Sequence, residues 1–104
     1  MMFRYSFQRL DVWKASKEQS VFIYKLTSDF PGEEKFGLIS QMRRAAISVS
    51  SNIAEGSSRL SSKDQAYFYQ LAYSSQTELI NQMLIAKELS YITIDILEDF
   101  ITDS

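Results

Sequence analysis

The stretch QMRRAAISVSSNIAEGSSR, from Gln41 to Arg59, decides the fold of this chain. Successive residues of an α-helix are rotated by about 100°. On such a helix six residues fall within an arc of roughly 100°, the width of a stripe that faces a core: Leu38, Met42, Ala45, Ala46, Val49 and Ile53. The small residues Ala45, Ala46, Ser48 and Ala54 would let a second helix come close. We expect Gly56 to end the helix, because glycine takes the left-handed conformation without a Cβ penalty.

A polar row flanks this stripe, and its five members lie within roughly 80° of one another: Gln41, Arg44, Ser48, Asn52 and Glu55. Ser75 and Glu78, from a later helix, would face it. One interpretation is a binding surface with Arg44 as its cation. The other is a hydrogen-bonded network between helices or subunits, in which a buried Arg44 would need a carboxylate such as Glu78 or Glu55. The closeness of the row to the apolar stripe favours an interface.

Helical spacing on both sides of this stretch predicts three further helices. The first covers about residues 10–28, with Trp13 as a core anchor and an inner face of Leu10, Trp13, Ser20, Tyr24 and Thr27. Residues 30–32, Phe-Pro-Gly, break it, and the central helix then runs from about Glu33 to about Glu55.

The third helix is capped by Ser61 or Ser62 and extends to about Ser90. Its predicted inner stripe is Phe68, Ala72, Ser75, Leu79, Met83, Ala86 and Leu89. Thr93 is expected to cap a last helix from Ile94 to about Thr102, with an apolar edge of Ile94, Leu97 and Ile101.

These elements predict a single all-α domain over residues 1–104, an antiparallel up-down-up-down four-helix bundle with a short fourth helix. Residues 1–9 are expected to form an irregular N-terminal arm. Its aromatic residues and arginines could stack on bases, but we favour their packing against the bundle.

Composition narrows the possible functions. The chain has no cysteine and no histidine, so disulfides, Ser-His-Asp or Cys-His nucleophiles and conventional zinc sites are excluded. The acidic pairs at 33–34 and 98–99 are neighbours on a helix and point in different directions. There is also no glycine-rich phosphate loop. We therefore expect no enzyme activity, no metal site and no cofactor. No apolar run approaches the roughly 20 residues of a membrane span, and we expect a cytoplasmic protein.

Charge is unevenly distributed in a chain whose net charge is −2. Residues 1–63 hold ten basic and six acidic residues, for +4, whereas residues 64–104 hold one basic and seven acidic residues, for −6. Phosphate binding needs Lys and Arg clustered on one face. The candidate nucleic-acid-binding residues are Arg43, Arg44, Arg59, Lys63, Lys14 and Lys17.

The run Q-M-R-R-A-A-x-S-x-x-x-N-I-A-E-G-x-x-R closely resembles the signature of the four-helix-bundle proteins named after the 23S rRNA intervening sequence. The resemblance spans about residues 10–92 and includes Val12-Trp13, Phe30-Pro31, Gly37-Leu38, Glu78-Leu79 and Leu84 to Lys87. It implies a homo-oligomer, with a ring-shaped pentamer as the known arrangement. A related branch, the accessory variability determinant proteins of diversity-generating retroelements, forms basic pentamers that bind nucleic acid and a reverse transcriptase. Members of the family usually have a longer final helix than this chain.

Two functional hypotheses follow. The leading one is a non-enzymatic, self-assembling scaffold or adaptor, whose partners are copies of itself and another protein. The alternative is an RNA- or DNA-binding oligomer that acts through the basic residues and partners a nucleic-acid enzyme such as a reverse transcriptase.

Overall fold

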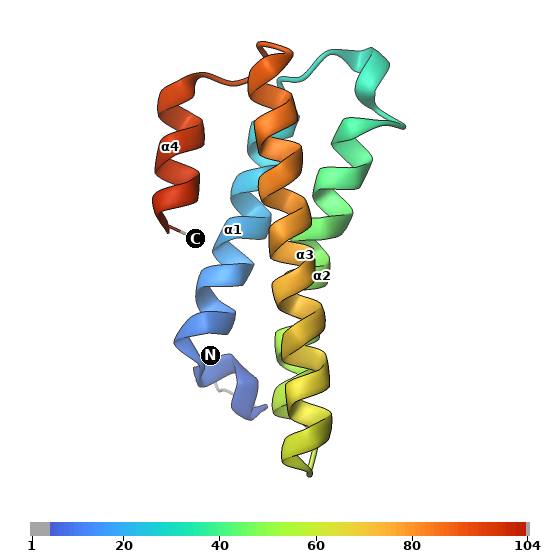
Figure 1. Cartoon of the computed structure of the whole chain (residues 1–104), viewed down its shortest axis with the longest axis vertical. Coiled ribbons are helices and arrows are strands. Elements are labelled where there is room, and N and C mark those ends of the chain that lie inside the picture. The colour runs from blue at the N-terminus through green and yellow to red at the C-terminus, as the bar shows by residue number, and fades with distance from the viewer. Residues whose placement is uncertain (1–4, 104) are drawn as a thin grey trace.

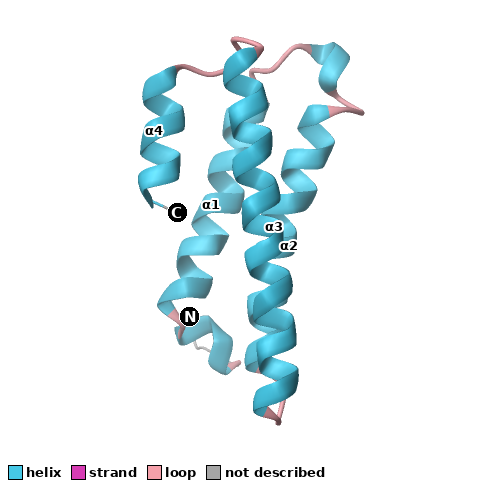
Figure 2. Cartoon of the chain, in the orientation of Figure 1, coloured by secondary structure: helices cyan, strands magenta, loops and turns pink. Residues whose placement is uncertain are grey.

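The computed structural model describes residues 5–103 and consists of helices joined by short turns (Figures 1 and 2). Its elements are the 3-10 turn η1 (Ser6–Arg9), α1 (Asp11–Thr27), the 3-10 turn η2 (Gly32–Glu34), α2 (Leu38–Ser57), α3 (Ser62–Glu88) and α4 (Ile94–Asp103). In Figure 1 the chain runs toward the top in α1 and α3 and toward the bottom in α2 and α4. The predicted all-α bundle with a short fourth helix is confirmed. Within residues 5–103, no helix combines the length and the apolar character that crossing a bilayer requires.

The core is centred on the predicted stripe of α2. Met42, Ala45, Ala46, Val49 and Ile53 are all buried, as predicted, and Leu38 is half-buried. Across from them α3 buries Ala72, Leu79, Met83 and Ala86, whereas Phe68 and Ser75 are half-buried. Leu89 is exposed, which the predicted stripe did not anticipate, because α3 ends at Glu88.

Small polar residues let α1 approach α2 closely. Ser16 and Ser20 are buried, and the Ser20 hydroxyl donates to the carbonyl oxygen of Ala46 at 3.0 Å. Backbone acceptors satisfy these hydroxyls, so their burial costs little. Of the predicted inner face, Ser20 and Thr27 are buried and Trp13 packs beside Val49, Ile53 and Ala72, whereas Leu10 and Tyr24 are exposed. Ile23, which is fully buried, takes the inward position expected of Tyr24.

The start of α2 differs from the prediction. The helix was expected to begin near Glu33, but Glu33 and Glu34 lie in η2 and α2 begins only at Leu38. The Glu34 carboxylate accepts a 3.3 Å hydrogen bond from the backbone N–H of Leu38. Glu34 therefore caps the start of α2 from its position in η2. The two glycines at 32 and 37 flank this irregular segment and disfavour a continuous helix there.

Gly56 has a different role from the predicted one. No described glycine has a positive φ, and Gly56 lies inside α2, which continues to Ser57. A Cβ atom at Gly56 would meet Cε1 of Tyr69 at 2.7 Å and Cβ of Phe68 at 3.1 Å. The prediction of a left-handed cap was therefore wrong: the glycine instead leaves room for the aromatic residues of α3, which approaches α2 here.

Among residues 5–103, the left-handed backbone conformation occurs at Ser90, with φ 63°. It follows α3, where the N–H of Tyr91 bonds to the carbonyl of Ala86 at 2.9 Å in a Schellman-type ending. At the other end of α3, the Ser61 hydroxyl accepts from the N–H of Asp64 at 3.1 Å, so Ser61 is the predicted cap.

The fourth helix and the N-terminal arm complete the fold. Thr93 caps α4 as predicted, accepting from the N–H of Ile96 at 3.3 Å. Of the predicted apolar edge only Leu97 is buried; Phe100 supplies the second buried side chain, and Ile94 and Ile101 are exposed. In the arm, Phe7 lies edge-on to Trp13 with ring centroids 5.0 Å apart. Residues 1–4 of the arm lie outside the described residues.

Candidate functional site

A seam of short polar side chains joins α2 to α3. The hydroxyls of Ser48 and Ser75 share a hydrogen bond of 2.8 Å. The amide of Asn52 donates to the Ser48 hydroxyl at 3.0 Å and to the Ser48 carbonyl at 2.9 Å. Three of the seven residues assigned to the predicted polar network therefore form one connected group, and all three are half-buried.

The other four members of that network lie on the outer rim of the seam. Gln41, Arg44, Glu55 and Glu78 are all exposed. Arg44 is thus not the buried cation that one interpretation required. Glu55 pairs with Arg59 at 3.2 Å, an exposed pair one helical turn apart, and such pairs contribute about 0–1 kcal/mol.

Gln82 is a member of this region that sequence reasoning missed. Its side chain is 4% exposed, and its amide donates to Oε1 of Glu78 at 3.3 Å. Its own Oε1 is buried and has no hydrogen-bond partner among the described residues. Gln82 follows Ser75 by seven residues, so both residues face the same side of α3. This spacing was the signal in the sequence that placed Gln82 beside the seam.

Three apolar residues and one glutamate form a row on the outward side of α3 next to the seam. Tyr67, Leu71, Glu78 and Ile85 fall within roughly 40° of one another on the helix, and all four side chains are exposed. Leu71, Glu78 and Ile85 recur every seven residues, the spacing of a helix that packs along a partner helix. We call this row, together with the polar row of α2 and Ser75, the α2–α3 face.

Most of the predicted basic residues are held by contacts within the bundle. Arg43 donates from Nε to the Thr27 hydroxyl at 2.9 Å and from a terminal nitrogen to the Tyr24 carbonyl at 3.1 Å. Its guanidinium also lies 4.5 Å from the centre of the Tyr24 ring. Arg43 thus ties α2 to α1 and uses two of its five N–H donors within the bundle.

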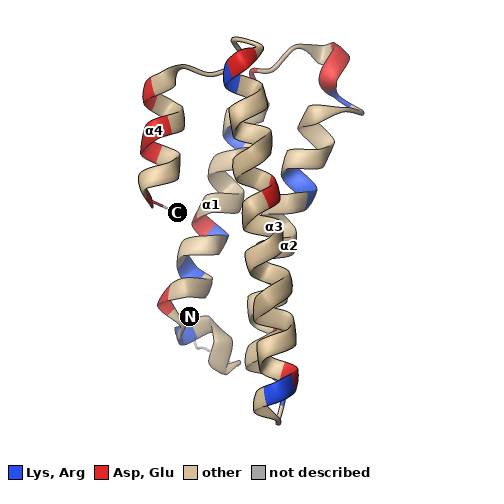
Figure 3. Cartoon of the chain, in the orientation of Figure 1, with Lys and Arg blue, Asp and Glu red and all other residues tan. Residues whose placement is uncertain are grey.

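The remaining basic residues are spread along the molecule (Figure 3). Arg44 lies in the first half of α2, whereas Arg59 lies beyond its end at Ser57, in the turn that leads to α3. Arg59 lies over the Phe68 ring at 4.5 Å, and Lys17 lies over Trp13 at 5.3 Å. Lys63 is the second residue of α3, four residues after Arg59, and Lys14 and Lys17 belong to α1. One subunit therefore distributes the six residues over α1, α2 and the start of α3 and does not gather them into one patch.

The carboxylates have structural contacts rather than a shared site. Glu34 accepts a 2.8 Å hydrogen bond from the Tyr91 hydroxyl in addition to capping α2. This bond, with burial and the charge of Glu34, raises the pKa of Tyr91 above its usual value. Among residues 5–103 there is no group of three or more Asp and Glu side chains placed to hold a metal ion.

Comparison with known proteins agrees with the fold and the central motif. The model of the family described as 23S rRNA-intervening sequence protein matches residues 8–104. A comparison with curated proteins found no match. The match includes all four α-helices and the polar seam, so the chain belongs to the family of 23S rRNA-intervening sequence proteins.

Proposed function

We propose that this chain is a non-enzymatic interaction protein that assembles with copies of itself through the α2–α3 face and serves as a scaffold or adaptor. The observation that supports the proposal is the exposed row of α3. Leu71 and Ile85 lie in contact with water on either side of Glu78, at heptad spacing. Burying them against a second copy would remove apolar surface from water, at about 25 cal/mol per Å².

The polar residues of the same face fit this role. Burial of Gln41 or Asn52 in an interface requires hydrogen-bond partners, and the facing amides of a second copy can supply them. Gln82 takes no part in these contacts, because its side chain is already buried within one subunit.

The family resemblance suggests a ring of five subunits. The absence of cysteine suits a reducing compartment, and we place the assembly in the cytoplasm as part of the proposal.

Sedimentation equilibrium at micromolar concentration tests the assembly. We expect a closed oligomer for the natural chain and monomers for the double variant Leu71→Glu and Ile85→Glu. The matched control is Val21→Glu with Leu84→Glu, since Leu84 adjoins Ile85 in sequence and is 44% exposed against 43%, but points to another side of α3. A monomeric natural chain contradicts the proposal, and so does equal dissociation of both double variants.

A second function, binding of RNA or DNA by the oligomer, is favoured by one observation. Arg59 and Lys63 are exposed and lie outside the α2–α3 face, and a ring would repeat them around its axis so that their fields add. Arg44 belongs to the face that the assembly proposed above would bury, and two of the five N–H donors of Arg43 are used within the bundle.

Fluorescence anisotropy with a structured RNA at about 50 and 200 mM salt tests this function. Six to ten phosphate contacts should lower affinity by about 10³–10⁵ over that range. Replacing Arg59 and Lys63 by alanine should abolish binding, whereas replacing the exposed Lys25 and Lys35 by alanine, which removes the same charge, should have little effect. Equal losses from both sets would show that the charge of the chain, and not this surface, attracts the RNA.

A further inference from the structure

Arg44 and Glu78 lie at the same level of the α2–α3 face. The two helices run in opposite directions (Figure 1), and they meet where the hydroxyls of Ser48 and Ser75 share a hydrogen bond of 2.8 Å. Arg44 lies four residues before Ser48 on α2, and Glu78 lies three residues after Ser75 on α3. Both are therefore displaced from this contact toward the same end of the bundle, by about 6 and about 4.5 Å.

Neither of these two charges is neutralised within one subunit. Both side chains are exposed, and among residues 5–103 the Arg44 guanidinium has no hydrogen-bond or ion-pair partner. Oε1 of Glu78 accepts only from the uncharged amide of Gln82, at 3.3 Å. The third charged residue of the face, Glu55, is paired with Arg59 at 3.2 Å. The α2–α3 face thus carries one unpaired cation and one unpaired anion.

Assembly through this face would place Glu78 where it needs a cation. Glu78 stands in the middle of the exposed row of α3, seven residues from Leu71 and seven from Ile85. A contact that covers these two apolar side chains also removes water from the carboxylate between them. Because an unpaired carboxylate is strongly disfavoured away from water, the covering surface has to bring a positive charge. Arg44 is the unpaired cation that this face itself provides.

A surface of this kind is complementary to a second copy of itself. In a contact between two copies, Arg44 of one can meet Glu78 of the other, and Oε2 of Glu78 is free to accept, because the Gln82 amide contacts Oε1. A guanidinium matches a carboxylate with two parallel N–H donors. We propose that Arg44 of one subunit forms an ion pair with Glu78 of a second copy, an inference that rests on the self-assembly proposed above. The pair would fix the register in which the copies meet.

Reversing the two charges in separate chains tests the pair. Sedimentation equilibrium compares the natural chain, Arg44→Glu, Glu78→Arg and an equimolar mixture of these two variants, all at the same total concentration. Each variant alone places like charges opposite one another, and we expect its self-association to weaken at least about tenfold. In the mixture each variant meets the opposite charge on the other, so assembly should return. A chain that carries both changes should also assemble by itself.

The mixture separates a contact between chains from a contact within one chain. Glu78→Arg also removes the hydrogen bond from Gln82, but a second chain cannot restore a bond within the first. Circular dichroism of each variant confirms that it is folded before mixing. Matched controls reverse exposed charges outside the α2–α3 face, in Lys25→Glu and Glu98→Arg. Neither control should change self-association, alone or mixed.

Three results would overturn the ion pair while leaving self-assembly in place. The first is unchanged assembly of Arg44→Glu and Glu78→Arg, and the second is equal dissociation by the control variants. The third is assembly of the chain with both changes but not of the mixture, which would place the pair within one subunit. A natural chain that is monomeric before any charge is changed would instead contradict the self-assembly, and the ion pair with it.

Discussion

Two polar bridges connect α3 to its neighbours, and they differ in the length of the side chains that form them. On one side, Ser48 of α2 and Ser75 of α3 meet directly, hydroxyl to hydroxyl, at 2.8 Å. On the other side, Gln19 of α1 and Gln76 of α3 exchange two amide hydrogen bonds, each 2.8 Å long. A pair of serines can meet only where helix backbones are close, whereas a pair of glutamines spans a wider gap.

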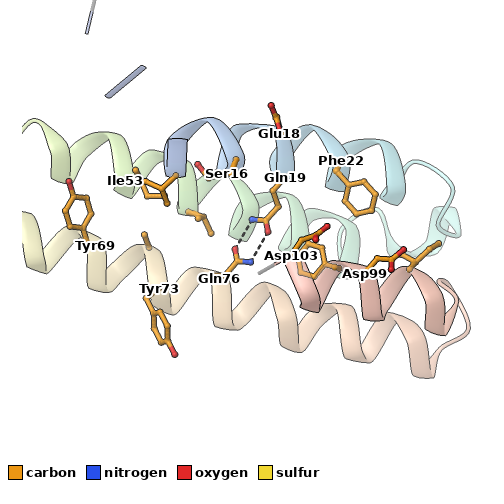
Figure 4. A pocket seen from close by; sticks show the side chains of 16 residues that line it. Ser16, Glu18, Gln19, Phe22, Ile53, Tyr69, Tyr73, Gln76, Asp99 and Asp103 are labelled. Carbon is orange, nitrogen blue, oxygen red and sulfur yellow. Dashed lines mark hydrogen bonds between the residues drawn. The ribbon is translucent and has the colours of Figure 1, made fainter. Parts of the chain in front are cut away.

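The two sides consequently have different properties. The α2–α3 side is packed through small residues, down to a glycine that contacts aromatic rings. The α1–α3 side leaves a groove of about 780 Å³, which residues of all four α-helices line (Figure 4). Close packing leaves little freedom for change, so substitutions on the α2–α3 side should affect stability most. The wider side should tolerate change.

The largest difference in the free energy of unfolding should be that between Gly56→Ala and Gly32→Ala, each of which adds one methyl group to the chain. Gly56→Ala places a Cβ 2.7 Å from the Tyr69 ring, and overpacking of this kind costs about 1–3 kcal/mol, partly offset by the better helix propensity of alanine. A Cβ at Gly32 meets no atom within 4 Å, so Gly32→Ala should be neutral or slightly stabilising. Urea unfolding of both variants measures the difference.

If Gly56→Ala proved as stable as the natural chain, α2 and α3 would be less tightly packed at this point than the structure shows. The Tyr69 ring would then have moved aside at little cost. Gly56→Ala with Tyr69→Ala should recover part of the loss, because the second change removes the ring that the new methyl group meets.

The sequence predicted the closely packed side better than the open one. The stripe from Met42 to Ile53 repeats with helical periodicity and is buried as predicted, because a single helix defines its own inner face. The role of Gly56 could not be predicted, since a glycine at the end of an apolar stripe is equally consistent with a cap and with a close contact. Only the position of Tyr69, thirteen residues later, distinguishes the two.

The groove could not be predicted from the sequence for a related reason. Periodicity shows which face of α1 and α3 points inward, but it does not give the distance between two helices that are not consecutive. The pairing of Gln19 with Gln76 depends on that distance. The polar seam was partly predictable, since Ser48 and Asn52 share a helix face. Gln82 was missed because glutamine is seldom buried.

Double-mutant cycles on the two bridges should show a smaller effect on the free energy of unfolding than Gly56→Ala. Ser48→Ala should cost about 1 kcal/mol, and more than Ser75→Ala, because it also removes the hydroxyl that accepts from Asn52. The coupling energy between Ser48 and Ser75 should be about 0.5–1.5 kcal/mol. The Gln19–Gln76 cycle, with both residues changed to alanine, should give a similar coupling but a smaller total loss. A larger total loss from the glutamines would contradict the distinction between a packed and an open side.

The smallest expected effect concerns the turn through which the chain enters α4. Tyr91 donates to the Glu34 carboxylate at 2.8 Å and lies against Phe30, with ring centroids 5.2 Å apart. Tyr91→Phe keeps the ring contact and removes only the hydrogen bond, which should lower the free energy of unfolding by less than the loss of either bridge. If the α4 side is held loosely, this single bond should influence its opening, and hydrogen exchange in α4 should accelerate more than in α2.

The pH dependence of this effect has a defined sign. Because the bond to Glu34 raises the pKa of Tyr91 in the folded chain, its contribution is complete below the unfolded value of about 10 and is lost as pH rises through the folded value. The stability difference between the natural chain and Tyr91→Phe should therefore shrink above about pH 10. Tyr73→Phe, a change at an exposed tyrosine of α3, serves as the control. A difference that persisted unchanged to higher pH would mean that the hydroxyl of Tyr91 does not stabilise the turn through Glu34, and the entrance to α4 would have to be held by the Phe30 contact instead.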